Sequence, residues 1–154
     1  MNLVRLTDKA LREYEQAREM LLAFTRDQNR ISNYFRAIDH LENCVSATHR
    51  ASLQAEVVRP RLGRSLALTG HQKDRLVEIR DVIEHMDDRL TGKLPAWKKN
   101  ALVIGPGEPT MLMPLDRRVQ IGSYKLTYRD LASCISKLYR LVMEIREVPI
   151  SRPG

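Results

Sequence analysis

The sequence predicts a mainly α-helical fold: an antiparallel bundle of four helices, or at most five, with a small β-hairpin inserted before the last helix. Apolar side chains recur every three or four residues over four segments, which is the period of a helix that buries one face. Between the third and last segments, prolines and glycines break this period, and a short alternating pattern typical of β-strands follows. The length of 154 residues, with 43% hydrophobic and 29% charged residues, suits one globular domain. We therefore expect a single domain over residues 1–148 and a flexible tail over 149–154.

The first two helices are expected from Thr7 to about Phe24 and from about Gln28 to Leu53. Residues 56–70 contain Pro60, Gly63 and Gly70, and are predicted to form a basic connecting loop. In the second helix one stripe of side chains is predicted to form core, namely Ile31, Tyr34, Phe35, Ile38, Leu41, Val45 and Thr48.

The third helix is expected from about His71 to Leu90, with Leu76, Ile79, Ile83, Met86 and Leu90 inward. The hairpin is predicted within residues 101–128, with Gly122-Ser123 as its turn and with 101–104 or 111–113 as candidates for a third strand. Thr127 and Asp130 resemble a capping box, which opens a fourth helix that runs to about Arg146. Its inward side chains are expected to be Leu131, Cys134, Ile135, Leu138, Val142 and Ile145.

Several classes of protein are not expected. No apolar run approaches the roughly 18 residues of a membrane span, and the first residues lack the apolar core of a signal peptide. The two cysteines, Cys44 and Cys134, each fall on the apolar face of a predicted helix. They are therefore expected to be free, buried thiols in a reducing compartment. We expect a cytoplasmic protein.

Basic residues exceed acidic residues by 26 to 19, and most of them are arginines. A net charge of +7 favours a polyanionic partner, and arginine suits bidentate contacts with phosphate. The alternative is a solvated basic surface without a partner.

Most known site motifs are missing. The chain has no GxxxxGK[ST], no GxGxxG and no nucleophile-elbow serine, and its four histidines lack zinc-ligand spacing. No glutamate is followed by a histidine three residues later, as in di-iron bundles. We expect neither a metal nor another cofactor.

One short motif remains, in the segment from Ile79 to Asp87. Arg80, a polar Asp81 and then His85 match the R-[polar]-x-x-x-H pattern. Together with a helical bundle of this length, the motif resembles HEPN domains (higher eukaryotes and prokaryotes nucleotide-binding). The resemblance implies a metal-independent endoribonuclease of the kind common in toxin–antitoxin and antiviral systems, in which two motifs meet at a homodimer cleft. It also allows a non-catalytic scaffold. Some members carry a tyrosine two residues after the histidine as a target for nucleotide addition, whereas this chain has Asp87 there.

Under this hypothesis each motif residue has a chemical role. His85 has the side chain that titrates near neutral pH, so it would act as acid or base on the RNA 2′-hydroxyl and 5′-oxygen. Arg80 would hold the scissile phosphate, and Asp81 would orient the imidazole by accepting its N–H. The structural alternative is an ion pair between Arg80 and Glu84 on a solvated helix, with His85 at its boundary.

Weaker candidates for nucleic-acid contacts lie elsewhere in the chain. Trp97 could stack on a base, and the others could neutralise phosphates. The alternative is that the charges are solvated and that Trp97 packs its loop onto the bundle. This weaker set consists of Arg36, His40, Arg59, Arg61, Arg64, Trp97, Lys98 and Lys99. The rival to the enzyme is a non-catalytic bundle that binds a protein partner, such as an antitoxin, or nucleic acid as a scaffold or regulatory subunit.

Overall fold

The computed structural model describes residues 2–26, 30–62, 68–84, 118–121 and 124–147. These contain four α-helices, α1 (Asn2–Arg26), α2 (Ile31–Val58), α3 (Gly70–Glu84) and α6 (Tyr128–Glu147), and a 3₁₀ turn, η1 (Arg59–Leu62). The strands β1 (Arg118–Ile121) and β2 (Tyr124–Thr127) pair antiparallel, with Arg118 opposite Thr127. The predicted helical bundle is confirmed.

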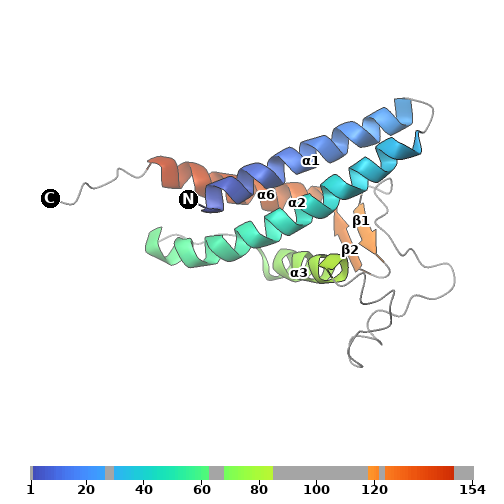
Figure 1. Ribbon diagram of the computed structural model, residues 1–154. Helices are drawn as coiled ribbons and strands as arrows, with labels where there is room; N and C mark the ends of the chain where they lie inside the picture. Colours follow the sequence, from blue (N-terminus) through green and yellow to red (C-terminus); the bar gives the residue numbers. More distant parts are fainter. Residues whose placement is uncertain (1, 27–29, 63–67, 85–117, 122–123, 148–154) are drawn as a thin grey trace, which may run out of the picture.

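Helices α1 and α2 form an antiparallel hairpin along the length of the bundle (Figure 1). Small side chains repeat every seven residues along both contact faces, with Ala10 and Ala17 on α1 and Ala37, Cys44 and Ala51 on α2, and all are almost fully buried. A seven-residue period keeps one face of each helix toward its partner, and small side chains let the two backbones approach closely. The Cys44 thiol donates to the carbonyl of Ala10 across this seam, at 3.4 Å.

Helix α1 starts five residues earlier than the sequence pattern predicts. Leu3 and Leu6 are buried in the core, so the first turns are held by packing. Thr7 does not cap the helix. Its hydroxyl donates to the carbonyl of Leu3 at 2.9 Å, a bond that a threonine inside a helix makes to the preceding turn.

The core stripe predicted for α2 is partly wrong. Ile31 and Phe35 are 61% and 47% exposed, whereas Ile38, Leu41, Val45 and Thr48 are buried as predicted. The prediction followed the large apolar side chains, but the buried face of α2 is centred on the small residues of the α1 seam. The helix also continues to Val58, into the predicted loop, because Ala55 packs in the core.

Helix α3 is held at its start and along its inner face. Thr69 and Gln72 form a capping box: the Gln72 N–H donates to the Thr69 hydroxyl, and the Thr69 N–H donates to the Gln72 side-chain oxygen, both at 3.2 Å. Leu76 and Ile79 are fully buried, as predicted. The predicted continuation to Leu90 lies outside the described residues, and the side chains of residues 82–84 are not described.

Helix α6 closes the core against α1, α2 and α3 (Figure 1). The predicted inward residues Leu131, Cys134, Ile135, Leu138 and Val142 are buried, and Ile145 is partly buried. At its start the Thr127 hydroxyl accepts from the N–H of Asp130 at 3.1 Å and donates to the Asp130 carboxylate at 2.8 Å. The carboxylate thus contacts the hydroxyl, whereas in a standard capping box it contacts the backbone N–H.

The two cysteines are free and buried, as predicted. Burial raises the pKa of the Cys44 thiol to about 12 and that of Cys134 to about 11. Both thiols therefore act as small apolar groups of the core. No helix in the described part of the chain is long and apolar enough to cross a membrane. The residues proposed for a third strand, 101–104 and 111–113, and the tail 149–154 lie outside the described residues.

Candidate functional site

The motif region lies on the second half of α3. Ile79 is buried in the core, which turns the next two side chains toward the surface. The guanidinium Nη1 of Arg80 donates to the Asp81 carboxylate at 3.1 Å, and the two side chains are 31% and 38% exposed. A phosphate could therefore reach Arg80 without any rearrangement of the core, although it would compete with Asp81 for the guanidinium.

The third motif residue, His85, lies outside the described residues. The role expected of Asp81, which is to orient the His85 ring, stays a prediction. One carboxylate oxygen of Asp81 accepts a hydrogen bond from Arg80, and the same carboxylate has further lone pairs that can accept from a second donor. The alternative pair between Arg80 and Glu84 is also untested, because the Glu84 side chain is not described.

A second group of charges joins the end of α2 to the start of α3. Glu56 contacts Lys73 of α3 and also Arg59, the latter at 3.5 Å. The hydrogen bond from Lys73 lowers the pKa of Glu56, and the charge of Arg59 acts in the same direction. Arg59, a candidate for nucleic-acid contacts, is thus held by a carboxylate, while Arg61 is exposed on η1. Lys73 precedes Arg80 by seven residues, about 10 Å along the helix axis, so these groups do not converge on the motif.

The candidates His40 and Arg36 lie elsewhere on α2. His40 Nδ1 is 2.7 Å from a carboxylate oxygen of Glu13 on α1, and both side chains are partly buried. Arg36 is exposed one turn earlier on α2. His40 and Glu56 are sixteen residues apart, about 160° around the helix, so the two candidate groups lie on opposite sides of α2.

The structure therefore brings together only part of the predicted set. Arg80 and Asp81 are paired, and Arg59 and Arg61 both lie on η1 with Pro60 between them, but Arg36 and His40 face another way. Arg64, Trp97, Lys98 and Lys99 lie outside the described residues. The residue pattern of α2 could not reveal Glu13 as the partner of His40, because Glu13 lies on α1, 27 residues away in sequence.

Neither the comparison with protein-family models nor those with curated proteins and solved structures found a match. In the part of the chain that the structure describes, no three His, Cys, Asp or Glu side chains form a group that could hold a metal ion. The described residues of α3 begin the motif and include two of its members, Arg80 and Asp81.

Proposed function

We propose that this protein is a metal-independent endoribonuclease of the HEPN type that acts as a cytoplasmic homodimer, with its site at the end of α3. The observation that carries the proposal is the arrangement of Arg80. It is partly exposed, it is held by the adjacent Asp81, and it lies on a helix that the buried side chains of Leu76 and Ile79 anchor in the core. A preorganised guanidinium of this kind suits a scissile phosphate, because its side chain loses little conformational entropy on binding.

The reaction would need two proton transfers and no oxidant. A base, for which His85 is the candidate, removes the proton from the RNA 2′-hydroxyl. The 2′-oxygen attacks phosphorus while the bond from phosphorus to the 5′-oxygen breaks. The 5′-oxygen receives a proton from an acid, for which a second copy of the motif across the dimer axis is the candidate. The products are a 2′,3′-cyclic phosphate and a 5′-hydroxyl, and Arg80 stabilises the charge on phosphate oxygens.

The test is cleavage of a mixed-sequence RNA in EDTA by the purified protein and by Arg80→Ala and His85→Ala. Arg75→Ala is a matched control, because Arg75 lies on the same helix, is 37% exposed and pairs with Glu78 at 3.3 Å. His71→Ala removes an exposed histidine at the start of that helix. We expect cleavage to fall by about 100-fold or more in the two motif variants and to persist in both controls.

Cleavage that survives equally in all four variants would refute the site, and its absence from the wild-type protein would refute the proposed activity. Mass analysis of the product ends gives a second readout. A 3′-hydroxyl in place of the cyclic phosphate would contradict attack by the 2′-oxygen.

The second candidate is a non-catalytic bundle that binds a protein partner, such as an antitoxin, or nucleic acid. The outward face of α2 favours it, because large apolar side chains are exposed near both ends of the helix. Exposed apolar groups that cluster on one face are typical of interaction sites. They are Ile31, Phe35, Leu53 and Val57. Phe35→Ser and Leu53→Ser should abolish partner binding or dimerisation under this function and leave the circular dichroism spectrum unchanged.

A further inference from the structure

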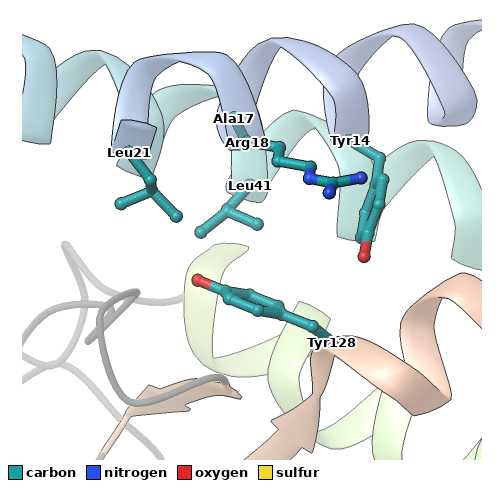
Figure 2. Close-up of a pocket in the computed structure, with 6 residues that line it drawn as sticks. All are labelled: Tyr14, Ala17, Arg18, Leu21, Leu41 and Tyr128. Atoms are coloured by element: carbon teal, nitrogen blue, oxygen red, sulfur yellow. The ribbon is translucent and has the colours of Figure 1, made fainter. Parts of the chain in front are cut away.

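A cavity of about 120 Å³ lies where α1, α2 and the first residue of α6 meet (Figure 2). It is remote in sequence from the α3 motif and plays no part in the proposed nuclease reaction. Its described lining consists of Tyr14, Ala17, Arg18, Leu21, Leu41 and Tyr128.

The floor of the cavity is formed by buried apolar residues. Ala17 and Leu41 are each only 1% exposed, and Leu21 closes one side. At position 17 the side chain that lines the cavity is only a methyl group. An engineered apolar cavity of about 150 Å³ in another protein binds benzene, so one aromatic ring is the size of ligand that this cavity would take.

Two aromatic rings and one charge surround this apolar space. Figure 2 shows the rings of Tyr14 and Tyr128 on two sides of the pocket, with the Tyr128 hydroxyl directed toward Leu21 and Leu41. Rings in such positions favour edge-to-face contacts with a bound aromatic ring. Arg18 is the charged residue of the described lining, and its guanidinium lies between Leu41 and Tyr14 in this view.

The guanidinium of Arg18 has no carboxylate partner among the described residues. Arg18 itself is exposed, so its charge stays hydrated at the mouth, while the floor beneath it is apolar. Arginine presents two parallel N–H donors that match the two oxygens of a carboxylate. The combination of an apolar floor and a cation at the mouth defines a ligand that is apolar at one end and anionic at the other.

We propose that this pocket is a binding site for a small aromatic monocarboxylate, with its ring on Ala17 and Leu41 and its carboxylate on Arg18. Benzoate is the simplest member of the class and has nine heavy atoms. A Kd of about 1 mM or below is expected, within the efficiency range of ligands of this size.

The experiment is a titration of the full chain with benzoate, followed by two-dimensional NMR, with benzyl alcohol as a neutral analogue of similar size. We expect saturable shifts at Tyr14, Ala17, Leu21 and Tyr128. Arg18→Gln should weaken benzoate binding about tenfold or more and change the affinity for benzyl alcohol less than about twofold. Arg12→Gln is the matched control, because it removes the same charge from an exposed position of the same helix.

A second variant, Leu21→Trp, places a larger side chain at the edge of the cavity and should abolish binding of both probes. Circular dichroism verifies that each variant is folded. Equal weakening of benzoate by Arg18→Gln and Arg12→Gln would overturn the proposal, since it would mean general attraction of anions. Benzyl alcohol that binds as tightly as benzoate would overturn the carboxylate specificity, and no saturable shift with either probe would overturn the site. RNA cleavage by the Arg18→Gln variant should be unchanged, which separates this site from the proposed nuclease.

Discussion

The side chain of Gln72 joins the start of α3 to α6, and its truncation tests how the helix that carries the motif is held. Gln72 is 6% exposed. Its oxygen accepts from the Thr69 N–H at 3.2 Å and from the Lys137 ammonium at 2.9 Å, and its nitrogen donates to the Ser133 hydroxyl at 3.2 Å. Gln72→Ala removes all three bonds and leaves their partners near a buried position.

The cost can be summed from these contacts. Each neutral hydrogen bond contributes about 0.5–1.5 kcal/mol, and a bond from a charged group contributes more when it is buried. Lys137 is partly exposed and can regain water, so its bond is counted as a neutral one. The total is a loss of about 1.5–4.5 kcal/mol in the free energy of unfolding. In a chain of this length this corresponds to a fall in Tm of about 3–18 °C.

Urea unfolding followed by circular dichroism measures the loss. Gln54→Ala makes the same substitution at an exposed position of α2, and it should stay within about 0.5 kcal/mol of wild type. Gln72→Glu keeps the oxygen acceptors for Thr69 and Lys137 but loses the donor to Ser133, so its stability should lie between wild type and Gln72→Ala. If Gln72→Ala is no less stable than Gln54→Ala, the reasoning from these bonds is refuted.

Three further predictions concern the core and its edges. Leu138→Ala, at a fully buried position, should cost about 2–5 kcal/mol in urea unfolding, and a loss under 1 kcal/mol would contradict the packing. Glu56→Gln should cost about 0.5–1 kcal/mol at pH 7. Because Lys73 lowers the pKa of Glu56 from 4.5, this stabilisation is present above that value and is lost as pH falls through the lowered pKa, so wild type and variant should converge in acid. Cys44, with a pKa of about 12, should resist iodoacetamide at pH 8 in the native protein and react in urea, as measured by mass spectrometry.

The success of the sequence prediction differs between helices for a physical reason. Helix α6 buries large side chains such as Leu131 and Leu138 on one face, and their helical spacing is a strong signal. Helix α2 buries Ala37, Cys44 and Ala51 against α1, and small side chains add little to a hydrophobic pattern. The prediction therefore chose the large residues, including Phe35, which the structure exposes.

In the candidate site, contacts within one helix could be predicted from the sequence and contacts between helices could not. Arg80 and Asp81 are adjacent in sequence, and their proximity could be predicted from the helix alone. The partners of His40 and Gln72 could not be predicted in this way, because they lie on other helices. The contact between Glu13 and His40 can be predicted only once the antiparallel register of α1 and α2 is known. Likewise, Ser133 is 61 residues from Gln72 in sequence. Contacts of this kind depend on tertiary packing, which periodicity does not specify.

The wall that Tyr128 contributes to the cavity has a consequence for the order of assembly. Helices α1 and α2 are neighbours in sequence, so their seam involves little loss of chain entropy and can form early. Helix α6 is far from α1 in sequence. Until α6 packs against α1, the cavity lacks the wall that Tyr128 forms. A ligand that requires this wall binds only the fully assembled bundle and adds its binding free energy to that state alone. A bound ligand would thus slow the detachment of α6 from the bundle. It would leave unchanged the rate at which α1 and α2 first pair.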